Sequence, residues 1–131
     1  MNRSGYSDDG DQWQLIKWRG AVTSALRGKR GQAFLREMVD ALDALPVKRL
    51  IQNELEAGGE VCALGAVGAR RGTPMTGLDP EDSDLIAEVF GISRAMACEL
   101  MYLNDEGKER YNETPEQRFD RMRKWVGAWT S

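Results

Sequence analysis

The residues best suited to chemistry in this chain are cations, and two groups of them stand in short turns bounded by glycine. Arg27-Gly28-Lys29-Arg30-Gly31 is one such turn, and Arg70-Arg71-Gly72 is the other. Cations beside glycine can hold an anion or a phosphate, but they also suit the negative carboxyl end of a helix, so both interpretations stay open. Neither turn is a phosphate-binding loop, because the spacing G-x-x-x-x-G-K-[ST] is missing.

The two turns matter most if the fold brings them together. Arg27, Lys29 and Arg30 would then join Arg70 and Arg71 in one patch for an anionic ligand. The weakest of the functional hypotheses follows from this arrangement. It is an enzyme or a small-ligand binder whose cleft is lined by the Arg70-Arg71 turn.

Most catalytic chemistry is excluded by residue type. The chain contains no histidine, which removes Ser-His-Asp and Cys-His catalysis, histidine metal sites and histidine pH switches. Cys62 and Cys98 form no C-x-x-C motif and each stands in an apolar segment, so we expect two buried, reduced thiols. Carboxylate pairs such as Glu54 and Glu56 do not face each other on a helix. We therefore predict a protein that is not an enzyme, with no catalytic residue, metal or cofactor.

Large side chains near both ends of the chain are suited to an interface. Trp13 and Ile16 lie off the apolar stripe of the first helix, so either another element covers them or they contact a partner. Trp129 belongs to the last helix. Tryptophan and arginine are common interface anchors. The predicted partner-binding residues are therefore Trp13, Ile16, Arg27, Lys29, Arg30, Arg70, Arg71 and Trp129.

The element that must organise these residues is the uncharged run over residues 61–69. It is the longest mid-chain run without a charge, whereas the other apolar segments alternate with charged residues. We predict a buried central helix over about residues 60–71, whose acidic first residue and basic last residues suit the helix dipole. Gly65 and Gly68 in that helix would let neighbouring helices approach closely.

Composition and periodicity place the chain among small helical domains. It has 131 residues, of which 41% are hydrophobic and 30% charged. Apolar residues at helical spacing predict further helices, among them 32–45, 46–56 and one from Pro80 that Asp79 caps. We expect an all-α fold, a compact bundle of about six helices around the central helix. Residues 11–131 form its single domain, after a flexible N-terminal tail over residues 1–10.

Net charge and targeting signals limit the expected partners and cellular location. The net charge is −3, with 11 basic and 9 acidic residues in 1–72 but 7 and 12 in 73–131. This mild asymmetry indicates a bipolar surface rather than a dedicated nucleic-acid binder. No apolar run reaches about 18 residues and the N-terminus lacks the apolar core of a signal peptide. We therefore expect a cytoplasmic protein with no membrane partner, and a homodimer remains open.

Residues 80–104 can be laid on a helix-turn-helix hairpin with Gly91 at the turn. Under this alternative the protein is a DNA-binding regulator that uses residues 83–104, with Ser93 and Arg94 as its DNA-binding residues. The side chains of the second helix do not suit DNA binding. Reading DNA needs hydrogen-bond donors, whereas the acidic Glu99 and Glu106 would be repelled by the phosphates. Packing of the hairpin within the fold is therefore the favoured interpretation.

Three segments resemble small proteins of tailed phages and their prophages. They are C-A-L-G-A at 62–66, A-C-E-L at 97–100 with N-D-E at 104–106, and T-P-E at 114–116 with Arg118, Arg121, Met122 and Trp125. The resemblance covers roughly residues 12–129 and carries no activity to transfer. It implies a bacterial host cell and an accessory role. We thus expect a non-enzymatic protein that binds and modulates or inhibits a host or phage protein, host defence complexes included.

Overall fold

The computed structural model describes residues 3–4, 12–106 and 112–130, with the backbone alone for residues 12–15. Within these ranges the fold is all-α, as the periodicity predicts. The helices are α1 (Gln12–Arg27), α2 (Lys29–Asp43), α3 (Ala63–Arg71), α4 (Ser83–Phe90), α5 (Arg94–Glu106) and α6 (Pro115–Trp129). A small antiparallel hairpin, β1 (Glu56–Ala57) and β2 (Glu60–Val61), precedes α3. No helix in the described ranges is long and apolar enough to cross a membrane.

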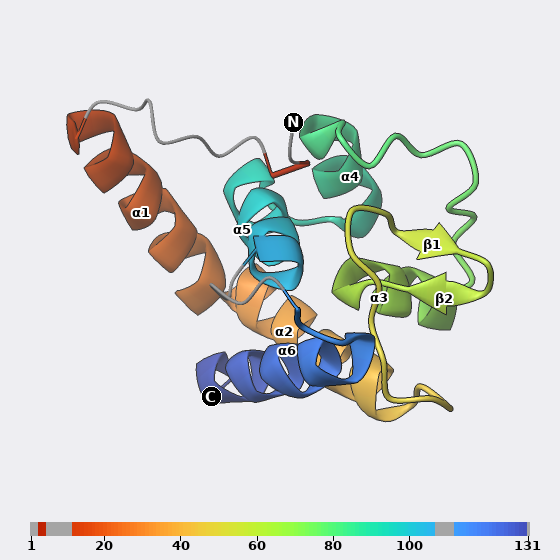
Figure 1. Cartoon of the computed structure of the whole chain (residues 1–131). Coiled ribbons are helices and arrows are strands. Elements are labelled where there is room, and N and C mark those ends of the chain that lie inside the picture. The colour runs from red at the N-terminus through yellow and green to blue at the C-terminus, as the bar shows by residue number, and fades with distance from the viewer. Residues whose placement is uncertain (1–2, 5–11, 107–111, 131) are drawn as a thin grey trace.

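The helices pack so that α1 lies at one edge of the bundle (Figure 1). Helix α2 packs against α3 and α6, and α5 packs against α1, α3 and α4. Helix α1 contacts α5 and α2 but leaves its remaining face to solvent, so that Ile16 is 59% exposed. The outer edge of the molecule is therefore made by α1 together with the start of α2.

The uncharged run is buried as predicted, but it shares the centre of the bundle with α5. Residues 61–68 are all buried, and so are residues 96–101 of α5. The close approach predicted at Gly65 is present, since a Cβ there would lie 1.9 Å from the Leu55 carbonyl oxygen. The neighbour is irregular backbone rather than a helix, and at Gly68 it is the Met75 side chain.

The helix predicted over residues 46–56 is absent, and the prediction was wrong. The segment between α2 and β1 is irregular because its backbone groups bond to distant parts of the chain. The Leu50 amide donates to the Pro115 carbonyl at 3.1 Å, and the Ile51 carbonyl accepts from Asn104 Nδ2 at 2.9 Å. Leu50 and Leu55 are still buried, but they reach the core from irregular backbone rather than from a helical face.

Two glycines that follow the range predicted for that helix turn the hairpin. Gly58 and Gly59 have φ of 59° and 82°, and paired positive values suit the two-residue turns that match strand twist. Glu60 consequently lies in β2, and α3 begins at Ala63 rather than at about residue 60. Cys62 is the N-cap of α3, where its Sγ accepts from the Gly65 amide at 3.3 Å.

Most other helix ends follow the local signals. Gly72 and Gly91 end α3 and α4 with φ of 72° and 71°, and Thr114 forms a capping box with Gln117. The hairpin predicted over 80–104 is present as α4, Gly91 and α5. Helix α4 starts later than expected, because Asp82 rather than Asp79 caps it by accepting from the Leu85 amide.

The N-terminal tail predicted over residues 1–10 lies mostly outside the described residues. Its two described residues, Arg3 and Ser4, are both 3% exposed. The Arg3 guanidinium donates to the Asp105 carboxylate at 2.6 and 2.9 Å, and that pair is almost fully buried beside α5.

Candidate functional site: a basic corner

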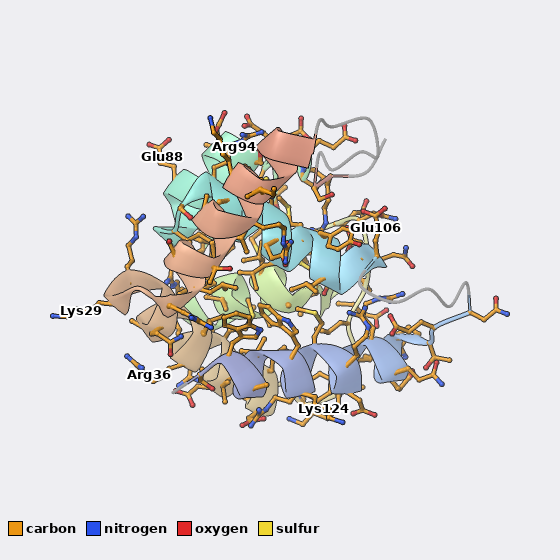
Figure 2. The ribbon with its side chains drawn as sticks, turned by 90° about the vertical axis from the view of Figure 1, so that its left-hand side faces the viewer. Lys29, Arg36, Glu88, Arg94, Glu106 and Lys124 are labelled. Atoms are coloured by element: carbon orange, nitrogen blue, oxygen red, sulfur yellow. The ribbon has the colours of Figure 1, made fainter. Side chains whose placement is uncertain are left out.

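The corner between α1 and α2 carries three of the predicted partner-binding cations and one further arginine. Arg27 ends α1, Lys29 and Arg30 begin α2, and Arg36 lies two turns beyond Lys29 on the same face of α2. We call these four residues the basic corner. All four are exposed, and none forms an ion pair with a carboxylate of the described residues. Lys29 and Arg36 extend from the same side of the molecule (Figure 2).

The position at which α2 starts makes the helix dipole unfavourable for two of these cations. Sequence analysis begins this helix at Gln32, which would leave Lys29 and Arg30 in a turn beside the negative end of α1. In the structure only Arg27 has that place, whereas Lys29 and Arg30 form the first turn of α2. Cations there face the positive end of the dipole, which is unfavourable. No acidic residue of that turn and no side-chain cap offsets them.

A hollow of about 230 Å³ lies beside these cations. The end of α1, the start of α2 and the turn before α5 form its walls. Its lining residues are Ser24, Ala25, Gly28, Lys29, Arg30, Gly31, Ile92, Ser93 and Met96. Gly31 allows this geometry, because a Cβ at that position would lie 1.8 Å from the Ala25 carbonyl oxygen. The fold thus brings Ser93, a residue of the DNA-binding alternative, beside Lys29 and Arg30.

The end of α6 supports the corner. The guanidinium of Arg27 lies 5.7 Å from the centre of the Trp129 ring, a distance at which cation and ring attract. Gln32 Nε2 donates to the Leu26 carbonyl at 2.7 Å and to the Trp129 carbonyl at 2.9 Å, so it ties the three helices together. Trp129 is half-buried and packs on Trp125, which makes it a support for Arg27 as well as part of the surface.

Arg71 does not join the basic corner as a free cation. Its guanidinium donates to both oxygens of Glu37 at 2.7 and 2.6 Å and to the Phe90 carbonyl at 3.2 Å. It also lies over the rings of Phe34 and Phe90. These contacts join α2, α3 and α4, so Arg71 has a structural role. Arg70 is exposed and helps to lower the pKa of Glu37.

The Glu37–Arg71 pair predicts a component of stability that acid removes. The hydrogen bond from Arg71 is the main reason why the pKa of Glu37 lies below its ordinary value. The stabilisation is therefore complete above the ordinary glutamate pKa of about 4.3 and is lost as pH falls through the lower folded-state value. In Glu37→Gln this component is absent. The urea midpoint should fall less between pH 7 and pH 3 in the variant than in the wild type. Equal falls would contradict the assignment.

The second helix of the hairpin is largely covered by other helices. Within α5 only Arg94 and Glu106 are exposed, because α1, α3 and α4 cover the rest. Ser93 caps α5 by accepting from the Met96 amide at 3.1 Å. Arg94 donates to Ser83 Oγ and lies over the Trp18 ring. A reading helix needs an exposed face that enters the major groove, and the fully exposed residues of α5 are limited to Arg94 and Glu106 at its two ends.

The two remaining partner-binding candidates stand on α1. Ile16 is exposed, as a contact with a partner requires, and it lies three turns before Arg27 on the same helix. The side chain of Trp13 lies outside the described residues. The structure therefore joins Arg27, Lys29, Arg30 and Trp129 at one corner and keeps Arg71 out of it.

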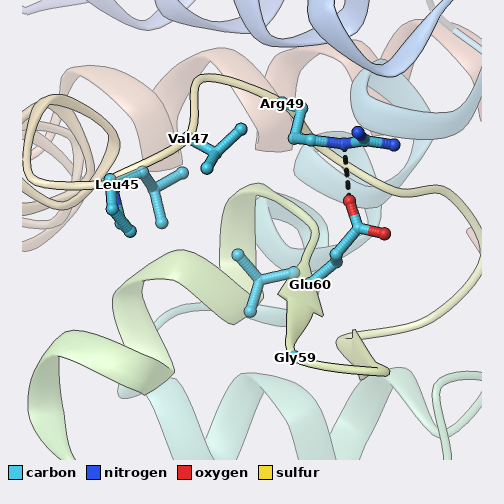
Figure 3. Close-up of a pocket in the computed structure, with 7 residues that line it drawn as sticks. Leu45, Val47, Arg49, Gly59 and Glu60 are labelled. Carbon is cyan, nitrogen blue, oxygen red and sulfur yellow. Dashed lines mark ion pairs between the residues drawn. The ribbon is translucent and has the colours of Figure 1, made fainter.

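A second hollow, of about 310 Å³, lies between the irregular segment after α2 and the hairpin (Figure 3). Its walls are mainly apolar, and Val47 beside it is 60% exposed. Its charged groups pair with each other, with Arg49 Nε 2.6 Å from Glu60 Oε1. Unlike the basic corner, this hollow offers no unpaired charge that would select a ligand.

Both cysteines are buried, as predicted. Burial raises the pKa of Cys98, which keeps it a protonated, unreactive thiol. The Sγ of Cys62 caps the N-terminus of α3.

The protein defined by this fold and corner is an all-α protein with one cationic edge. Comparisons with protein-family models, curated proteins and solved structures find no match to the chain. Evidence for a function therefore comes from the residues of this chain alone.

Sequence analysis missed Arg36 and the full extent of the positive charge. From Gln12 to Arg36 the chain holds six cations and no acidic residue, in a protein of net charge −3. Summing the positive and negative charges over a window as long as two helices identifies this segment. Comparing the two halves of the chain hides it, because the acidic residues on either side cancel the cations.

Proposed function

We propose that this chain is a non-enzymatic accessory protein of phage type, which acts in the bacterial cytoplasm by binding a host or phage protein and modulating or inhibiting it. Host defence complexes are among the candidates. The observation that supports it best is the basic corner, an exposed group of four cations that form no ion pair with a carboxylate of the described residues. Charged groups that the fold leaves unpaired are available to a partner, and arginine is a frequent anchor of interfaces.

The chemistry of the remaining residues agrees with a binding role. Buried polar side chains of the described residues take part in structural contacts, such as Arg118 with the Leu50 carbonyl and Asn104 with the Ala63 amide. The exposed Ile16 extends the same edge with an apolar side chain. An edge that combines cations with an aromatic and an aliphatic residue has the composition of a protein-binding surface.

The proposal is tested by capture from a lysate of the bacterial host. The tagged wild-type protein should retain a specific protein, and the purified pair should elute together from a size-exclusion column in a fixed ratio. The matrix without the protein is the control. If nothing is retained beyond that control at low salt, where charge contacts are strongest, the proposed function is wrong.

A further inference from the structure

One edge of this chain is formed by a segment whose charged residues are all positive. Lys17, Arg19, Arg27, Lys29, Arg30 and Arg36 lie in a segment without acidic residues, and the rest of the chain is acidic overall. Arg19 is paired with the buried Glu99 at 3.0 Å. The cations of the basic corner have no such pairing within residues 3–4, 12–106 and 112–130, so their charge acts on whatever approaches the edge.

The position of Lys29 and Arg30 in α2 argues against a structural role for their charge. Both stand in the first turn of α2, where an acidic residue would stabilise the helix and a cation opposes its dipole. Places where local rules are broken without compensation inside the fold are typical of functional sites. The charge at this corner is therefore best explained by a ligand.

We propose that the basic corner docks an acidic segment of the partner protein, whose carboxylates lie against Lys29, Arg30 and Arg36. This inference rests on the proposed function and specifies the kind of partner. The hollow lined by Ser24, Ser93 and Lys29 receives one of the acidic side chains. Arg36 contacts another, since it lies about 10 Å from Lys29 along α2.

Other occupants fit the corner less well. A single phosphate does not reach both Lys29 and Arg36, because they are two helical turns apart. A second copy joined symmetrically at the same corner would place cations against cations. A DNA duplex extends beyond the corner onto acidic residues, with Asp40 further along α2 and Glu88 on α4 at the same side of the molecule (Figure 2). An acidic polypeptide of a few residues matches both the charge and the extent.

The experiment measures binding of fluorescein-labelled poly-L-glutamate by anisotropy at about 50 mM salt. The variant is Lys29→Glu and the matched control is Lys124→Glu, an exposed lysine of α6. Lys29→Glu should weaken binding at least about tenfold, and Lys124→Glu less than about twofold. Binding to the wild type should weaken as salt rises. Lys29→Glu places an acidic residue at the positive end of α2, so its Tm should not fall and lost binding will not reflect unfolding.

Three results would overturn the inference. They are tighter binding of a 20-base-pair DNA duplex than of poly-L-glutamate, tighter binding of inorganic phosphate, and equal effects of Lys29→Glu and Lys124→Glu. The outcome is separable from that of the lysate capture. If a partner is retained but Lys29→Glu does not release it, the protein binds a partner through another surface. If poly-L-glutamate binds at the corner but no partner is retained, the proposed function fails alone.

Discussion

Replacing Gly65 by alanine is expected to lower the free energy of unfolding by about 3 kcal/mol or more, at the upper end of what overpacking costs. The added Cβ would lie 1.9 Å from the Leu55 carbonyl oxygen and 3.1 Å from Val61 Cβ. That oxygen is backbone, and it accepts from the Cys62 amide at 3.2 Å. It therefore cannot move without opening the junction between the hairpin and α3. Urea denaturation followed by circular dichroism measures the loss.

Gly20→Ala is the matched control for this substitution. Gly20 also lies inside a helix, but a Cβ there meets nothing within 4 Å. Alanine is a better helix former than glycine by about 0.5–1 kcal/mol, so this variant should be more stable than the wild type. If Gly65→Ala and Gly20→Ala change stability in the same direction, close backbone contact is not the reason for glycine at position 65.

Arg118→Met should destabilise the protein by about 3 kcal/mol, because it breaks a buried polar network while keeping much of the side-chain volume. Arg118 is 5% exposed, and burial lowers its pKa. Its guanidinium donates to the Leu50 carbonyl and to Gln52 Oε1, both at 2.9 Å, and lies 3.5 Å from Glu113. These bonds hold the irregular segment after α2 against α6. The measurement is the urea midpoint at pH 7.

Arg123→Met on the same helix provides the comparison. Arg123 pairs with Asp43 at 2.8 Å, but the two side chains are 35% and 53% exposed. Exposed pairs contribute about 0–1 kcal/mol because water solvates and screens both charges. The variant should therefore lose less than about 1 kcal/mol. Losses of similar size at Arg118 and Arg123 would contradict the structural role assigned to Arg118.

The helix ends show which parts of the fold local sequence can predict. Gly72 and Gly91 end helices at positive φ, and Thr114 with Gln117 closes a capping box. Each of these signals acts on backbone groups a few residues away, so it can be read from the chain alone. The irregular segment after α2 could not be read in this way. Its Leu50 amide bonds to Pro115, and that partner is known only once the chain has folded.

The candidate site could likewise be predicted only in part from the sequence. The cations at Arg27, Lys29 and Arg30 and their glycine neighbours were visible as a pattern. Their opposition to the dipole of α2 was not visible, since it depends on where α2 starts. Close to that start, Gly31 packs against the Ala25 carbonyl at the crossing of α1 and α2. The pairing that removes Arg71 from the site also comes from a distant residue, Glu37.

The sequence by itself determined the helical class, the buried run before Arg70, most helix ends and the residues able to act as anchors. These follow from periodicity and from contacts within one or two turns, which depend on neighbouring residues. Only the tertiary structure decided which cations stay unpaired. An ion pair forms or fails according to which side chains the fold brings within about 4 Å, whatever their separation in the chain. The basic corner is therefore a property of the packed helices, although each of its residues is plain in the sequence.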